Sequence, residues 1–184
     1  MNTISANGNG GRRNRLRPFI WGMAAILLSL PAVAMWLGIA GVDWSAFDFI
    51  AMGAMLAVAC GLYELGAWLS GDAAYRAGFG MAALAGFATV WVNLAVGMLG
   101  DEDNPANLMF LGVLFVAVAG ALLARLKPRG MAWAMGAAAL AQLLAVAVAI
   151  PMGFEARELA LSACFALPWL AAALLFGRAR GAGA

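Results

Sequence analysis

Six apolar segments dominate the sequence and constrain its fold more than any other feature. Each has about 20 residues, and a helix of that length crosses a hydrocarbon core of about 30 Å. Hydrophobic residues make up 65% of the chain and charged residues only 11%, whereas soluble domains carry about 25% charged residues. The sequence therefore predicts an all-α membrane protein, a bundle of six transmembrane helices over residues 18–177. The segments lie at about 19–40, 47–69, 77–99, 105–125, 131–151 and 157–177.

The basic residues predict the orientation of this bundle. If the N-terminus is cytoplasmic and the spans alternate, ten of the 11 Lys and Arg residues lie in cytoplasmic segments, as the positive-inside rule requires. Only Arg157 lies outside, together with most acidic residues, and five or seven spans would spoil this sorting. We expect both termini in the cytoplasm. Residues 1–17 are then a flexible basic tail and residues 178–184 a short second tail.

The first apolar segment has an alternative interpretation. Basic residues, an apolar run and then Pro31 and residues 32–34 (AVA) resemble a signal peptide with its cleavage site. The apolar run continues to Ala40 and a long tail precedes it, which favours a retained span. Cleavage would leave five spans in the same orientation.

A short motif recurs at the start of the three spans that run outward. It reads GMAAI at residues 22–26, GMAAL at 80–84 and GMA at 130–132. Three helical hairpins in parallel repeat would explain it. Chance similarity in an alanine-rich chain is the alternative.

The short loops carry residues typical of helix ends. Ser45 and Asp48 resemble a capping box at the start of the second span. Asp72 and Asn104 are predicted to cap the third and fourth spans, and Gly153 to end the fifth. Prolines inside the first and sixth spans predict kinks at Pro31 and Pro168.

Glu64 is the one charged residue deep within a span. At 100° per residue it shares a helix face with small residues, which mark the packing side of a membrane helix. We expect Glu64 to point into the bundle, with Arg76 as its favoured ionic neighbour and Arg125 or interfacial water as the alternatives. A structural ion pair and a working carboxylate both fit this position. The small face holds Gly53, Ala57, Cys60 and Gly61, and the opposite face holds Met55, Val58, Leu62, Leu65 and Leu69.

The third and fifth spans also bring polar residues to faces rich in small residues. With Glu64 and Arg76, Thr89, Asn93 and Gln142 form a candidate intramembrane polar site, a string across the bundle. The alternative is that these amides join helices, at about 0.6–2 kcal/mol for each hydrogen bond. The third-span face comprises Ala82, Gly86, Thr89, Asn93, Gly97 and Gly100, opposite Leu84, Phe87, Trp91 and Met98. The fifth-span face comprises Met135, Ala138, Gln142, Ala145 and Ala149.

The densest polar cluster lies in the loop before the fourth span. Its residues Asp101, Glu102, Asp103 and Asn104 are a candidate site for a hard cation such as calcium or magnesium. The loop lacks the spaced ligands and turn glycine of a calcium loop. Acidic residues also suit the positive N-terminus of the fourth span, and this structural interpretation is favoured.

The composition excludes several kinds of chemistry. The chain has no histidine and therefore lacks the commonest metal ligand and proton shuttle. Cys60 and Cys164 each lie inside an apolar run, and both are predicted to be core residues. We expect no metal, no cofactor, no nucleic-acid partner and no enzymatic activity.

Several motifs resemble a widespread family of small, uncharacterised bacterial inner-membrane proteins. The most specific are residues 91–97 (WVNLAVG) and 102–109 (EDNPANLM), and the likeness covers spans two to five. The resemblance implies a membrane fold and no particular activity. It also implies that the following belong to the family pattern: Glu64, Tyr75, Arg76, Trp91, Asn93 and residues 102–107.

Two functions fit these features. The leading hypothesis is a bundle, or a subunit of one, that translocates a small solute, an ion or a proton, with Glu64 at its centre. The alternative is an accessory or sensor protein that binds another membrane protein, or a second copy of itself, through its helix faces. A transporter predicts a wet cavity reaching Glu64, whereas an accessory protein predicts a dry bundle.

Overall fold

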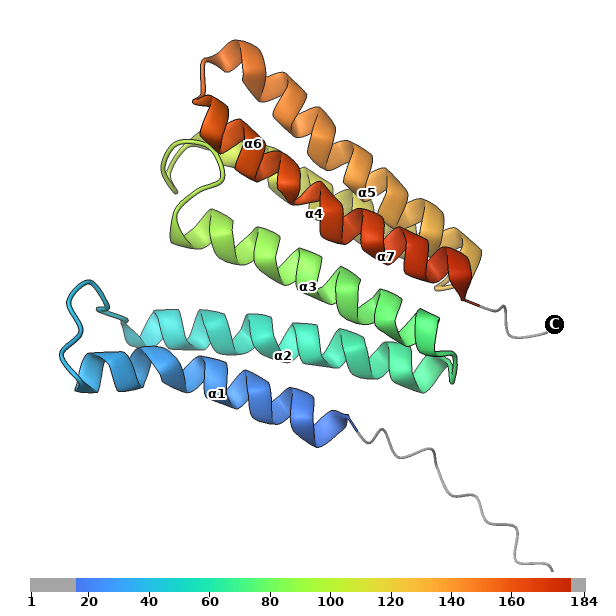
Figure 1. The fold of residues 1–184 in the computed structure, drawn as a ribbon, viewed down its shortest axis with the longest axis horizontal. Coiled ribbons are helices and arrows are strands. Elements are labelled where there is room, and N and C mark those ends of the chain that lie inside the picture. The colour runs from blue at the N-terminus through green and yellow to red at the C-terminus, as the bar shows by residue number, and fades with distance from the viewer. Residues whose placement is uncertain (1–15, 180–184) are drawn as a thin grey trace, which may run out of the picture.

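The computed structural model describes residues 16–179, and every regular element in that range is a helix (Figure 1). The predicted tails therefore lie mostly outside the described residues, except that Arg17 and Arg178 are helical. The elements are α1 (Arg17–Trp36), α2 (Ala46–Leu69), α3 (Ala73–Ala95), η1 (Pro105–Asn107), α4 (Leu108–Leu123), α5 (Pro128–Ala149), η2 (Ile150–Met152), α6 (Ala156–Cys164) and α7 (Ala166–Arg178).

The six predicted spans are confirmed. Each one-turn helix continues the helix next to it, and α6 with α7 forms one span, so that six segments are long and apolar enough to cross a membrane. The last span breaks at Phe165, three residues before Pro168, which supplies no backbone N–H and whose ring disfavours a continuous helix here. Pro31, by contrast, lies inside an unbroken α1.

The helices alternate in direction, so the charged residues separate between the two ends of the bundle (Figure 1). Arg17, the α2–α3 turn, the α4–α5 turn and Arg178 lie at one end, which we call the basic end. The α1–α2 loop, the loop from residue 96 to 104 and the α5–α6 turn lie at the other. The fold thus brings together the segments that the charge pattern assigned to one side of the membrane.

The predicted helix ends are confirmed. Ser45 and Asp48 form a reciprocal capping box at the start of α2. Asp72 accepts a hydrogen bond from the backbone N–H of the third residue of α3, and Asn104 caps η1. Gly153 ends the fifth span with a φ of 85°, a conformation that suits glycine.

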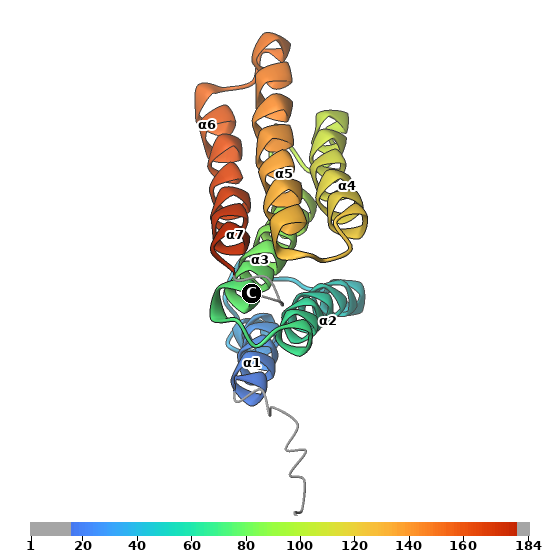
Figure 2. The same cartoon turned by 90° about the vertical axis from the view of Figure 1, so that its right-hand side faces the viewer.

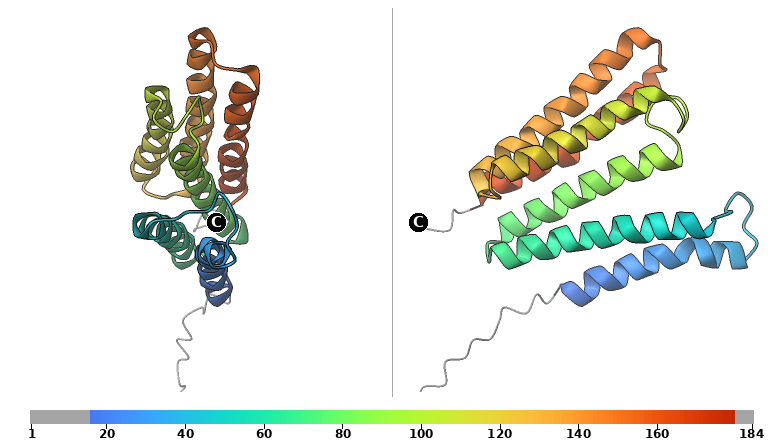
Figure 3. Two further views of the ribbon diagram at one scale, coloured as in Figure 1. Left: turned by 90° about the vertical axis from the view of Figure 1, so that its left-hand side faces the viewer. Right: turned by 180° about the vertical axis from the view of Figure 1, so that it is seen from behind.

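The core lies among α3, α4, α5 and α7, away from the N-terminal helices. Figure 2 shows α5 flanked by α4 on one side and α6–α7 on the other. α3 packs against α7 and α2, while α1 packs mainly on α2 and has no buried residue. Both views in Figure 3 place α1 and α2 farthest from α5. The three predicted helical hairpins are not packed alike. The helices α3 and α4 make little contact with each other, whereas α5 and α7 pack closely.

Aromatic rings fill the core at the basic end. Tyr75 and Phe79 of α3 meet Phe176 of α7, with ring centroids 5.2–5.4 Å apart. Such spacing is favourable for aromatic pairs. Two glycines allow this close packing: Gly78 faces the ring of Phe176, and Gly66 of α2 faces Phe79.

The predicted helix faces are partly right. In α5 the whole face is confirmed, since Met135, Ala138, Gln142, Ala145 and Ala149 are all buried. In α3, Thr89 is buried and Leu84 exposed as predicted, but Met98 is buried, in the loop after the helix.

The α2 face is partly wrong. Ala57 and Gly61 are exposed, whereas Met52, Leu56, Cys60 and Gly66 are buried. Small residues lie on two sides of α2, and α3 packs on the side that carries Gly66.

Candidate functional site

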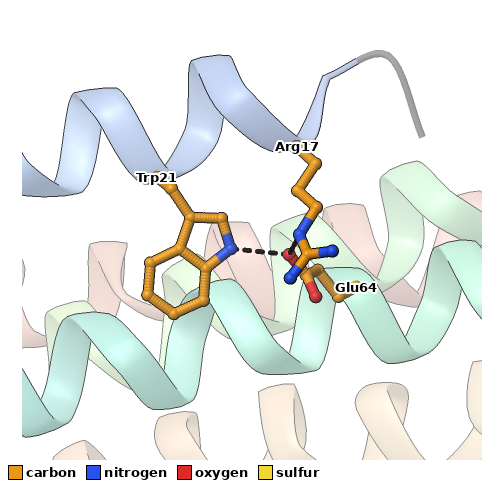
Figure 4. A network of polar contacts seen from close by, with 3 residues as sticks. All are labelled: Arg17, Trp21 and Glu64. Atoms are coloured by element: carbon orange, nitrogen blue, oxygen red, sulfur yellow. Dashed lines mark hydrogen bonds and ion pairs between the residues drawn. The ribbon is translucent and has the colours of Figure 1, made fainter. Parts of the chain in front are cut away.

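Glu64 joins α2 to α1 rather than lying at the centre of the bundle. Its Oε1 accepts a hydrogen bond from the indole Nε1 of Trp21 at 2.6 Å. The same oxygen forms an ion pair with Nε of Arg17 at 2.8 Å (Figure 4). The α1 residues stand one helical turn apart, so both reach the same carboxylate. The side chains of Arg17 and Glu64 are 66% and 29% exposed, which places the pair at the edge of the helix pair.

The expected pairing of Glu64 with Arg76 is therefore wrong. Arg76 donates a hydrogen bond from Nη2 to the hydroxyl of Tyr63 at 3.2 Å. Tyr63 precedes Glu64 by one residue, which turns its side chain about 100° away, toward α3. Arg17 takes the place of Arg76 because α1 packs on the α2 face that carries Glu64.

Tyr75 links the start of α3 to the α4–α5 turn at the basic end. Its hydroxyl donates to the carbonyl of Leu126 at 2.6 Å, and its ring is buried. Leu126 and Arg125 have positive φ angles of 57° and 49°, which are unusual for residues with a side chain. The hydrogen bond holds the α4–α5 turn in this conformation against the start of α3.

The predicted polar string does not form. Thr89 donates to the carbonyl of Ala85, and Asn93 donates to the carbonyl of Thr89, so both hydrogen bonds stay within α3. Gln142 is fully buried and donates to the carbonyl of Ser162 at 2.9 Å. Thr89, Asn93 and Gln142 thus hydrogen-bond backbone carbonyls, and among residues 16–179 none of them bonds Glu64.

The hydrogen bond that Gln142 donates reaches the sixth span near the break between α6 and α7. The carbonyl of Ser162 also accepts from the N–H of Phe165, the residue between α6 and α7. At a break in a helix, some backbone carbonyls lose their intrahelical donor. Here the side-chain amide of Gln142 on α5 donates to the carbonyl of Ser162. Oε1 of Gln142 and Nε1 of Trp169 are buried without a hydrogen-bonding partner in the described part of the chain.

A second polar network holds the loop between α3 and α4 in the bundle. Oδ1 of Asn107 accepts from the N–H groups of Met98 and Leu99, and its Nδ2 donates to the carbonyls of Leu99 and Asp101. Ser162 donates to the carbonyl of Met98 at 2.8 Å. The buried loop backbone therefore obtains its partners from Asn107 and from α6.

The acidic loop residues do not gather into a site. Asp101, Glu102 and Asp103 are exposed, and Asn104 caps η1. Within residues 16–179 no three Asp, Glu, Cys or His side chains converge in a way that could hold a metal ion. The cluster surrounds the start of the fourth span, where acidic residues favour a helix N-terminus.

The cysteines lie in different surroundings. Cys60 is buried as predicted, but Cys164 is exposed on the outside of the helix bundle, which makes the prediction of a core position wrong.

Comparisons with family models, curated proteins and solved structures found no match to this chain. The resemblance to small bacterial inner-membrane proteins therefore stays a prediction.

Sequence reasoning included Asn107 only as part of the polar run and did not single out three other residues that form these contacts: Arg17, Trp21 and Ser162. Ser162 is the only hydroxyl in its apolar segment, and Asn107 closes the densest polar run, so both carried a signal. Arg17 and Trp21 carried none, because the contact depends on which helix packs beside α2.

Proposed function

We propose that this chain is a non-enzymatic accessory protein of the bacterial inner membrane that binds another integral membrane protein through α1 and α2. The observation that carries the proposal is the exposed face of α1. A row of small residues lies there at spacings of three and four, on one side of the helix. The row comprises Gly22, Ala25, Ser29 and Ala32.

In a membrane, exposed small residues indicate a helix-packing surface more strongly than exposed large residues do. Lipid covers large aliphatic side chains without cost, whereas small residues allow a second helix to approach closely. α2 adds Ala54, Ala57 and Gly61, which are also exposed. Helical geometry places both rows on the same side of the antiparallel pair, away from α3. We call these seven residues the small-residue face.

The arrangement of α1 supports the same function. The helix has no buried residue and packs on α2 along a narrow stripe containing Ile20, Ala24 and Leu28. Most of its surface is therefore free for a partner. α2 in turn packs against α3, which belongs to the tightly packed core together with α5 and α7.

Site-specific photocross-linking in native membranes tests the proposal. A photoreactive residue at Ala25 or Ala57 is expected to give one discrete protein adduct. Matched residues at Leu111 and Val118, which are exposed on α4, are expected to label only lipid. A bulky Gly61→Leu change should abolish the Ala25 adduct without lowering the yield of protein. Lipid adducts alone at all four positions would refute the function.

Translocation of a proton or small solute is the second candidate, and the observation in its favour is the carboxylate of Glu64 within a span. Translocation of protons would require Glu64 to exchange protons with both sides of the membrane. Its engagement with Arg17 and Trp21 on the outer side of α2 argues for a structural role instead. A measurement of proton flux through the protein separates the two functions.

A further inference from the structure

A depression lies at the start of α1, at the basic end of the bundle. Its volume is about 490 Å³, and Arg17, Pro18 and Trp21 line it. It is open on one side, as expected for a site on the outer surface of a membrane helix. Pro18 and Trp21 make most of its wall apolar, and Arg17 supplies a positive charge.

The guanidinium of Arg17 has hydrogen-bonding capacity left over. Its ion pair with Glu64 is made at Nε, and none of the hydrogen bonds found among residues 16–179 involves its two terminal nitrogens. Those nitrogens carry four N–H groups in a planar fork. A phosphate offers two oxygens at matching spacing, and this bidentate pairing is stronger than that of a lysine.

The carboxylate of Glu64 contacts both Arg17 and the indole N–H of Trp21, and with Arg17 it forms a neutral pair. What Arg17 offers to an anion is therefore its terminal N–H groups rather than a net charge. Three further arginines, Arg12, Arg13 and Arg15, precede Arg17 in the sequence. Basic clusters beside a membrane helix attract anionic lipid.

The apolar wall indicates a lipid rather than free phosphate. Trp21 lies four residues after Arg17, about 6 Å farther along the helix. Its hydrogen bond to Glu64 fixes the ring, and tryptophan prefers the level between headgroups and acyl chains. A phosphate at Arg17 would thus place an acyl chain over Pro18 and Trp21.

We propose that Arg17, Pro18 and Trp21 form a binding site for one anionic phospholipid. The terminal guanidinium nitrogens bind its phosphate, and the indole and the proline ring contact the start of an acyl chain. Pro18 lies four residues before Gly22 on the same side of α1, so the site adjoins the small-residue face. The test changes only Arg17 and Glu64, which lie outside that face, so its failure would leave the proposed function untouched.

Native mass spectrometry of the full-length protein tests the site, with dioleoyl phosphatidylglycerol and dioleoyl phosphatidylcholine as probes. The design compares Glu64→Gln with the double variant Arg17→Gln/Glu64→Gln. Both lack the ion pair, so a difference between them reports the contact of Arg17 with lipid alone. We expect Glu64→Gln to retain one tightly bound phosphatidylglycerol and the double variant to bind it about tenfold more weakly.

Arg178→Gln is the matched control, because Arg178 is also an exposed arginine at the basic end. It should bind phosphatidylglycerol like the parent protein. Equal affinity in Glu64→Gln and the double variant would overturn the site, as would equal binding of phosphatidylcholine. An equal loss in Arg178→Gln would show attraction by general charge only. Displacement of the lipid by inorganic phosphate would show a phosphate site without a lipid contact, which also overturns the proposal.

Discussion

Gly66 of α2 lies directly against the side chain of Phe79 in α3. A Cβ atom at position 66 would stand 2.6 Å from both Cβ and Cγ of Phe79. The neighbour is the rigid base of an aromatic side chain in the core, so it cannot move aside cheaply. Glycine at this position therefore sets the distance between the N-terminal helix pair and the rest of the bundle.

Gly66→Ala is expected to lower the free energy of unfolding by about 1–3 kcal/mol, because overpacking forces the helices apart. Reversible unfolding by sodium dodecyl sulfate measures this change. Gly61→Ala is the matched control in the same helix, since nothing lies within 4 Å of its Cβ position. If the two variants are equally stable, the close contact of α2 with α3 is wrong.

A second pair tests the packing of α4 on α5. A Cβ atom at Gly120 would lie 2.7 Å from Cβ of Ala134, whereas Gly112 has open space around it. Gly120→Ala should destabilise the protein by about 1–3 kcal/mol, and Gly112→Ala should leave stability within about 0.5 kcal/mol. The same unfolding assay applies. Equal destabilisation by both changes would contradict the arrangement of these helices.

Asn107→Ala tests the loop network. The change leaves the N–H groups of Met98 and Leu99 and the carbonyl of Leu99 without their side-chain partner, whereas the carbonyl of Asp101 keeps the N–H of Asn104. We expect a loss of about 2–4 kcal/mol. Asp103→Ala is the control, because Asp103 is exposed in the same loop. Thermal unfolding in detergent measures both. A stable Asn107→Ala protein would mean that the loop does not depend on this side chain.

The orientation predicts which loops a membrane-impermeant thiol reagent reaches. In a protein with both native cysteines replaced by alanine, a cysteine at Asp103 should label from outside intact cells. A cysteine at Lys127 should label only after the membrane is opened. Both residues are exposed at opposite ends of the bundle. The reverse pattern would place the basic end outside and refute the charge argument.

The sequence was sufficient to predict features that depend on local order. Span number follows from segment length, and the caps at Ser45 and Asp72 follow from residue type beside an apolar run. The buried face of α5 was also predictable, because Gln142 shares it with small residues and α5 packs between α4 and α7. Periodicity identifies the packing face when a helix has neighbours on one broad side.

Features that depend on the spatial order of helices were not predictable. Arg17 and Arg76 both lie at the basic end, and only the packing of α1 on α2 selects Arg17 for Glu64. α2 carries small residues on two sides, so periodicity did not identify the side that meets α3. The carbonyl of Ser162 accepts the side-chain amide of Gln142 in addition to the N–H of Phe165, and the sequence does not show which neighbouring helix supplies that second donor.

Proton flux into proteoliposomes tests the central claim that Glu64 joins α1 to α2 and does not carry protons. The experiment imposes a pH gradient and compares the parent protein, Glu64→Gln and protein-free liposomes, with a pH-sensitive dye inside. The account predicts the same slow flux in all three samples. A flux with the parent protein above that of protein-free liposomes, abolished in a well-folded Glu64→Gln variant, would contradict it.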